Sequence, residues 1–161
     1  MSQTKLVLLD NTVLSNFAVV QRTDIVLKLW KVVNTTPQAW DEFKSGITLG
    51  YVPYDAWKTI ALTELAHTEL EIADKLSKVL GMGERTCLAV VHCRGGLFVS
   101  DDRKARQVAL KLGVQVTGTL GILVVAVDRK IIPIGDANHL LAQMIKNGYR
   151  SPVDNLNSLL S

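Results

Sequence analysis

The order of hydrophobic patterns along the chain predicts an α/β fold, a three-layer α/β/α sandwich around a central parallel sheet. Short apolar runs alternate with stretches in which apolar residues recur at helical spacing, which is typical of a parallel sheet covered by helices. Two runs, 6–9 and 97–100, are continuously apolar, as expected for strands buried on both faces. With 161 residues, 48% of them hydrophobic, the chain is long enough for one domain with a substantial core. We therefore expect a single domain over 1–161, with a C-terminal helix and tail from about residue 136.

The first half of the chain is expected to contain three strands and four helices. The strands are expected at 6–9, 31–34 and 57–63. The helices are expected at 13–20, at 23–30, from residue 37 onward and at 64–80, with a loop over 46–55. Thr36 followed by Pro37 is typical of a helix start, because a capping residue stands before a proline in the first helical position.

The second half of the chain continues the alternation after a glycine-rich break at 81–83. The expected helices are 84–93, 103–112, 119–127 and 136–146, and the expected strands are 97–100 and 114–117. Gly148 follows the last helix as a stop signal. These elements complete the strand–helix alternation on which the predicted sheet depends.

Composition excludes several classes of protein. Cys87 and Cys93 are too few for a disulfide-rich scaffold and match no metal motif, so we interpret both as small core residues. The longest apolar run, 122–127, is far short of the roughly 20 residues that a membrane span needs, and no signal peptide is recognised at the N-terminus. We expect a soluble cytoplasmic protein without a membrane partner. The net charge of +3 is compatible with a polyanionic partner but does not identify one.

Acidic residues follow the two most apolar strands. Asp10 ends the first run, and Asp101 and Asp102 end the second. Because ligands of open α/β sheets bind at the carboxyl ends of the strands, we expect these carboxylates to converge there. Their mutual repulsion favours a hard cation such as Mg²⁺ or Mn²⁺. Each acid also has a simpler interpretation, as a helix cap or a favourable charge in a first helical turn.

Two further acids and a set of basic residues could belong to the same site. Glu84 stands in a first helical turn, and Glu42 could instead lie on the solvated face of its helix. The basic residues close in sequence to the acids are Arg85, Arg103, Lys104 and Arg106. They could hold a phosphate backbone at the rim of the site, or they could only neutralise the neighbouring acids.

Several segments, taken in order, resemble the PIN-domain nucleases, which include the VapC-type toxins of toxin–antitoxin pairs. The resemblance covers nearly the whole chain. The segments are Leu8-Leu9-Asp10-Asn11-Thr12-Val13-Leu14-Ser15, Thr36-Pro37 leading to Glu42, Gly81-Met82-Gly83-Glu84, Ser100-Asp101-Asp102-Arg103-Lys104-Ala105-Arg106, Thr117-Gly118-Thr119-Leu120-Gly121-Ile122-Leu123, and a tail from Ile132 through Leu140-Leu141 to Gly148-Tyr149.

The resemblance implies a PIN-like α/β/α sandwich with a cluster of acids that holds Mg²⁺ or Mn²⁺. It implies that Asp10, Glu42, Glu84 and Asp102 are the catalytic, metal-binding acids, and that Asp101 assists them. Thr12 matches a small polar residue that supports the first acid, and Ser100 stands in a similar supporting position before the last ones. The sequence departs from the usual pattern in the order of Asn11 and Thr12 and in having glutamate rather than aspartate at position 84.

Two functional hypotheses follow from the residues and the resemblance. The first is a metal-dependent ribonuclease that hydrolyses RNA, as the toxin of a toxin–antitoxin pair, with RNA, an antitoxin protein and a second copy of the chain as partners. The second is a catalytically degenerate PIN-like domain that binds RNA or a protein. A phosphatase with Asp10 as nucleophile fits less well, because Thr12 stands where that chemistry usually has a second aspartate.

Overall fold

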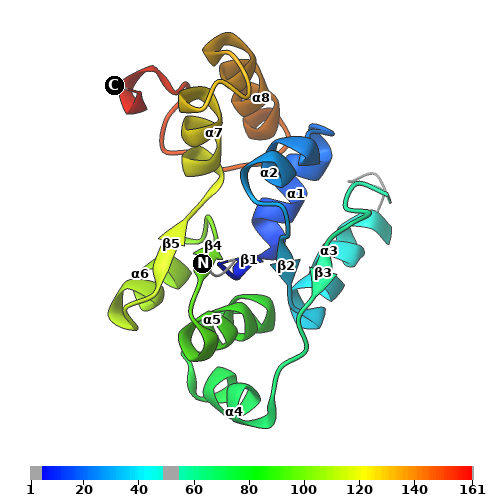
Figure 1. Ribbon diagram of the computed structural model, residues 1–161, viewed down its shortest axis with the longest axis vertical. Helices are drawn as coiled ribbons and strands as arrows, with labels where there is room; N and C mark the ends of the chain where they lie inside the picture. The colour runs from blue at the N-terminus through cyan, green and yellow to red at the C-terminus, as the bar shows by residue number, and fades with distance from the viewer. Residues whose placement is uncertain (1–4, 49–54, 161) are drawn as a thin grey trace.

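Five parallel strands form the central sheet of the computed structural model, which describes residues 5–48 and 55–160 (Figure 1). The strands are β1 (Val7–Leu9), β2 (Asn34–Thr35), β3 (Ala61–Leu62), β4 (Leu97–Val99) and β5 (Gln115–Thr117). Their order in the sheet is β3-β2-β1-β4-β5. All neighbouring strands run parallel, so every strand ends at the same edge of the sheet. The predicted α/β fold with a central parallel sheet is therefore confirmed.

Helices cover both faces of this sheet (Figure 1). The helices are α1 (Asn11–Val19), α2 (Thr23–Leu29), α3 (Pro37–Thr48), α4 (His67–Lys75), α5 (Met82–Arg94), α6 (Arg103–Lys111), α7 (Thr119–Asp128) and α8 (Ile134–Lys146), followed by a short 3₁₀ turn η1 (Asn157–Leu159). On one side of the sheet lie α1, α2, α7 and α8, and on the other lie α4, α5 and α6 (Figure 1). Among the described residues, no helix is both long and apolar enough to cross a bilayer.

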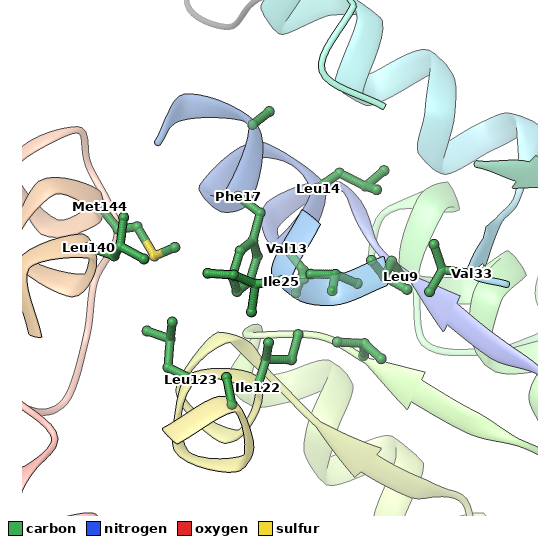
Figure 2. Close-up of a cluster of buried hydrophobic side chains, with 14 of the residues drawn as sticks. Leu9, Val13, Leu14, Phe17, Ile25, Val33, Ile122, Leu123, Leu140 and Met144 are labelled. Carbon is green, nitrogen blue, oxygen red and sulfur yellow. The ribbon is translucent and has the colours of Figure 1, made fainter. Parts of the chain in front are cut away.

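The two faces of β1 belong to two separate hydrophobic clusters. Leu8 packs with Leu88 and Phe98 in the cluster under α5 and α6. Leu9 belongs to the larger cluster on the opposite face, where Phe17 meets side chains of α7 and α8 (Figure 2). Because both faces are covered, the strands need apolar residues at successive positions, which explains the continuous runs in the sequence. Each fully buried Leu or Phe contributes roughly 1.5–3 kcal/mol to folding.

The expected strand over 57–63 is wrong at its start, because only Ala61–Leu62 pairs in the sheet. Trp57 lies in a turn instead and is only 5% exposed. Its indole N–H donates to the Leu14 carbonyl oxygen at 2.9 Å. The apolar character of this segment therefore reflects closure of the core and not strand pairing.

The expected helix over 64–80 is too long at both ends. It begins after Ala66, whose backbone N–H donates to the Glu69 carboxylate at 2.7 Å, and it ends at Lys75. Leu76 is extended, and Leu80 is buried in a separate turn. The apolar stripe that continues to residue 80 thus belongs to two packing elements.

The structure differs from the sequence prediction in three smaller features. The strand expected at 31–34 pairs only at Asn34–Thr35. Part of the loop expected over 46–55 is helical, because α3 extends to Thr48, and residues 49–54 lie outside the described residues. Cys87 is buried as expected, whereas Cys93 is exposed and is not a core residue. Helix ends elsewhere agree with expectation to within one or two residues.

Candidate functional site

Asp10 lies where β1 ends and α1 begins, and it is almost fully buried. Its Oδ1 accepts hydrogen bonds from Thr12 Oγ1 at 2.8 Å and from the Val13 backbone N–H at 3.3 Å. Its Oδ2 accepts a hydrogen bond from the Ser100 hydroxyl. The parallel register of β1 and β4 pairs Leu9 with Val99, and so it places the two following residues side by side. Asp10 is therefore both the cap of α1 and a carboxylate fixed at the strand ends.

Burial raises the pKa of Asp10 from 3.8 to about 7, and the negative charge of Asp101 adds to the rise. The hydrogen bonds from Ser100, Thr12 and Val13 act in the opposite direction but do not cancel the effect of burial. Ionising this carboxylate near neutral pH therefore costs free energy unless a cation compensates it.

Glu84, in the first turn of α5, shares this environment. Its pKa is raised from 4.5 to about 7, first by burial and then by the charges of Asp102, Asp10 and Glu42. The fold therefore brings Asp10, Glu42 and Asp102 near enough for their charges to act on Glu84, although the four acids come from different parts of the chain. In the sequence, Asp10, Glu84 and Asp102 were marked only by their places at predicted strand ends and helix starts, and Glu42 only by the family resemblance.

Glu42 is positioned by the glycines before and within the start of α5. Its Oε1 accepts a hydrogen bond from the Gly83 backbone N–H at 3.0 Å. A side chain at Gly83 would meet Glu42 Oε2 at 2.7 Å and the Ala39 Cα at 3.0 Å. The absence of a side chain at Gly83 allows α3 and α5 to approach, and the contact holds the exposed Glu42 carboxylate beside the site.

The two neighbouring aspartates at the end of β4 have different surroundings. Asp102 caps α6, since its Oδ2 accepts from the Ala105 backbone N–H at 2.8 Å. Asp101 accepts from the Thr119 backbone N–H at 2.7 Å, from the Thr119 hydroxyl at 2.6 Å and from Asn16 Nδ2 at 3.0 Å. Both oxygens of Asp101 thus hold α1, α6 and α7 together, whereas Oδ1 of Asp102 accepts no hydrogen bond within residues 5–48 and 55–160. Sequence reasoning did not identify Asn16 or Thr119, because these contacts span 85 and 18 residues.

Two adjoining cavities open beside these carboxylates. The acidic cavity, of about 400 Å³, is bounded by Glu84, Asp101 and Asp102 together with residues of α1. The basic cavity, of about 620 Å³, is bounded by Arg103, Arg106 and Arg150. Asp101, Tyr149 and Arg150 border both cavities. Tyr149 and Arg150 come from the segment after α8, which sequence reasoning did not assign to the site.

The predicted nucleic-acid-binding residues fall into different places. Arg103 and Arg106 border the basic cavity, and Lys104 is exposed on α6. The Arg106 guanidinium also donates to the Ser100 carbonyl oxygen at 3.1 Å. Arg85 is only 9% exposed and donates to the Ala73 carbonyl oxygen, between α5 and α4. We therefore do not place Arg85 in contact with nucleic acid.

The chemistry of the acids fits a hard divalent cation. In the described part of the chain, Asp10, Glu84 and Asp102 form no ion pair with Lys or Arg. Carboxylate oxygens are the ligands that Mg²⁺ and Mn²⁺ prefer. Among the described residues, however, no group of three or more His, Cys, Asp or Glu side chains is placed closely enough to hold a metal ion. Donor type and mutual repulsion thus fit a cation, while the side chains are not in coordinating positions.

Comparison with known proteins agrees with this geometry. The family model described as a PIN domain (DUF3368) matches residues 6–161. No curated protein matches the chain. PIN domains are typically nucleases and generally use divalent metals. The match spans almost the whole sequence and accords with a parallel sheet that has carboxylates at its strand ends, so the chain belongs to the PIN-domain family.

Proposed function

We propose that this protein is a metal-dependent endoribonuclease that hydrolyses RNA phosphodiester bonds with Mg²⁺ or Mn²⁺. The observation that carries the proposal is the meeting of Asp10, Glu84 and Asp102 at the carboxyl ends of β1 and β4, with Glu42 held beside them. Burial and neighbouring negative charge raise the pKa of Asp10 and of Glu84, and carboxylates in such surroundings gain most from a bound cation. A phosphodiester presents the oxygens that such a cation binds.

The protein residues supply position and charge for this chemistry. When bound, a divalent cation activates water and stabilises the negative charge that develops on the phosphoryl oxygens. Asp10, Glu42, Glu84 and Asp102 would hold the cation. The hydrogen bonds from Thr12 and Ser100 fix the orientation of the Asp10 carboxylate at the strand ends.

Basic residues at the rim would orient the RNA. Arg103 lies at the start of α6, directly after Asp102, and Lys104 is exposed beside it. Arg106 is tied to the Ser100 carbonyl oxygen and is therefore held in a fixed position near the acids. These side chains would contact phosphates on either side of the scissile bond. Asp101 would act through the α7 contacts that it makes and not as a principal ligand.

An RNA cleavage assay with Mn²⁺ tests the proposal. The wild type should cleave RNA, and Asp10→Asn should not, because the substitution removes a charged oxygen ligand without changing side-chain volume. Asp41→Asn is the matched control, since Asp41 is an exposed carboxylate on α3 that pairs with Lys44 at 3.3 Å. Equal cleavage by the wild type and Asp10→Asn would refute the assignment.

The alternative of a catalytically degenerate PIN domain has one observation in its favour, which is that the described acids are not placed to coordinate a metal ion. In that case the acids are structural, and the domain binds RNA or a protein partner without cleaving it. Calorimetric titration with MgCl₂ and with MnCl₂ separates the two functions. Absence of binding at millimolar metal supports the degenerate domain.

The proposal extends to a role as the toxin of a toxin–antitoxin pair, acting in the cytoplasm, with an antitoxin protein and a second copy of the chain as partners. The family resemblance supports this extension, because VapC-type toxins are among the PIN-domain proteins that the sequence resembles. Expression of the wild type in bacteria should then arrest growth, and expression of Asp10→Asn should not. Arrest by both forms would count against RNA cleavage as its cause.

A further inference from the structure

The acidic and basic cavities adjoin but carry opposite charge. Glu84, Asp101 and Asp102 face the acidic cavity, where Arg150 is the one Lys or Arg among the residues that line it. Of the described residues that line the basic cavity, three are arginines and one, Asp101, is a carboxylate. A ligand that spans both cavities therefore needs an oxygen that can bind a cation held in the acidic cavity, and an anionic group that can bind the arginines of the basic cavity.

The single carboxylate in the basic cavity does not neutralise it fully. Asp101 directs both oxygens to hydrogen bonds with Thr119 and Asn16. Arg106 is partly committed, through its bond to the Ser100 carbonyl oxygen. Arg103 and Arg150 are exposed, and they form no ion pair in the described part of the chain. Two guanidinium groups are thus available to an anion such as a phosphate.

The remaining wall of the basic cavity is apolar. Leu110, Leu120 and Pro152 line it, and Leu110 is 69% exposed although it lies on an amphipathic helix. Exposed apolar surface beside arginines suits a ligand with one flat apolar part and one anionic part. A nucleotide has both, whereas a free phosphate or a carboxylate side chain has only the anionic part.

Tyr149 stands at the partition between the cavities in a position that the backbone fixes. Gly148 adopts a positive φ of 112° after α8, and the Tyr149 N–H then donates to the Met144 carbonyl oxygen at 3.0 Å. This turn reverses the chain at the end of α8 and leaves the ring half-buried against the larger cluster. An aromatic ring held in this way offers a face on which a base can stack.

We propose that the basic cavity binds an unpaired nucleotide adjacent to the scissile phosphodiester. Arg103 and Arg150 bind its phosphate, and its base lies against Leu110 and Leu120, with Tyr149 stacking between this nucleotide and the next. The nucleotide in this subsite must be unpaired, because a paired base could not enter the cavity. The location of the cut rests on the proposed function, whereas nucleotide binding in the basic cavity does not require the metal.

Fluorescence anisotropy in EDTA tests the subsite apart from cleavage. The probe is a fluorescein-labelled RNA dodecamer without self-complementarity, compared with the same strand in a duplex. The variants are Arg150→Ala, Tyr149→Leu and Tyr149→Phe, and Lys111→Ala is the control. Lys111 is an exposed basic residue at the end of α6 that borders neither cavity. Thermal unfolding of each variant establishes that it is folded, which matters most for Tyr149→Leu.

Arg150→Ala should weaken binding of the single strand about tenfold, and the slope of log K against log salt should fall by about one. Tyr149→Leu should weaken binding by a similar factor, and Tyr149→Phe should not, because the ring and not the hydroxyl group stacks. Wild-type affinity in both Arg150→Ala and Tyr149→Leu would overturn the proposal. So would equal affinity for the duplex, or displacement of the RNA by polyglutamate of the same charge.

The results separate this inference from the proposed function. Binding that depends on Arg150 and Tyr149, without cleavage in Mn²⁺, supports the subsite and contradicts the nuclease. Cleavage that is abolished by Asp10→Asn, together with binding that is indifferent to Arg150 and Tyr149, supports the nuclease and overturns the subsite.

Discussion

Replacing Asp10 with asparagine should stabilise the metal-free protein at pH 8 while it abolishes metal-dependent stabilisation. The folded state raises the pKa of this buried carboxyl from 3.8 to about 7. A raised acid pKa means that the folded protein holds the proton over a range in which the unfolded chain has lost it. Stability therefore falls as the pH rises from about 4 to about 7, and the full cost is present at pH 8.

The magnitude follows from the size of this pKa change. A rise from 3.8 to about 7 is about three pKa units, and each unit corresponds to about 1.4 kcal/mol, so the ionised carboxylate costs about 4 kcal/mol. The asparagine side chain keeps one oxygen, which can accept hydrogen bonds from the Thr12 hydroxyl and the Val13 N–H. Its NH₂ group can only donate, so the Ser100 hydroxyl, which donates to Asp10 in the wild type, would have to accept. Allowing about 1 kcal/mol for this change, we expect a gain of about 3 kcal/mol. For a domain of this size the melting temperature should rise by roughly 6–12 °C.

Thermal unfolding in EDTA at pH 4 and pH 8 measures this effect in the wild type, Asp10→Asn and Asp41→Asn. The gain should be present at pH 8 and should nearly vanish at pH 4, where the folded wild type holds the proton. Asp41→Asn should differ little from the wild type at either pH, since exposed ion pairs contribute at most about 1 kcal/mol. Addition of MnCl₂ at pH 8 should raise the melting temperature of the wild type but not that of Asp10→Asn.

Two results would refute this reasoning. If Asp10→Asn is less stable than the wild type in EDTA at pH 8, the hydrogen bonds to the carboxylate outweigh the cost of its burial. If the stability difference is the same at pH 4 and pH 8, the effect does not come from ionisation.

Two further substitutions test the framework around the site. Gly118→Ala should destabilise the protein by about 1–3 kcal/mol, because the alanine Cβ would lie 2.5 Å from Asp101 Oδ1. Urea unfolding measures the change in stability. Unchanged stability would show that α7 can shift to make room for the methyl group. Glu69→Ala should cost about 1–2 kcal/mol, since it removes two hydrogen bonds of 2.7 Å from Arg94 and the cap of α4. Because the Arg94 side chain is 41% exposed, water solvates the guanidinium that Glu69→Ala frees and limits the loss of stability. A loss above about 4 kcal/mol would contradict this account. Equal losses at low and high salt would show that the charges of Glu69 and Arg94 contribute nothing.

The strand-end acids could be predicted because parallel strands end at a common edge. Two apolar runs that each end in aspartate were enough to predict that Asp10 lies near the pair Asp101–Asp102. The register of β1 and β4, which pairs Leu9 with Val99, confirms this proximity. The simpler interpretation of an acid as a helix cap also holds for two of them, since Asp10 caps α1 and Asp102 caps α6. The two interpretations were not alternatives, because one carboxylate can cap a helix and still lie at the site.

Long-range contacts could not be predicted from local patterns. The Asn16 contact with Asp101 spans 85 residues, and nothing in the spacing of either residue indicates it. Arg85 was expected beside the acids because it follows Glu84 directly. On a helix, neighbouring residues point about 100° apart, so that Glu84 reaches the site while Arg85 is buried against α4.

The sequence by itself determined the class of fold, because runs buried on both faces and helical periodicities are local consequences of how strands and helices expose their side chains. It also determined which edge of the sheet carries the acids. Tertiary structure alone decided which side chains share one environment: burial raises the pKa of Asp10 and Glu84 only when the surrounding elements exclude water. The same holds for Tyr149 and Arg150, which reach the cavities only because α8 ends in a turn that directs the chain back toward α6 and α7.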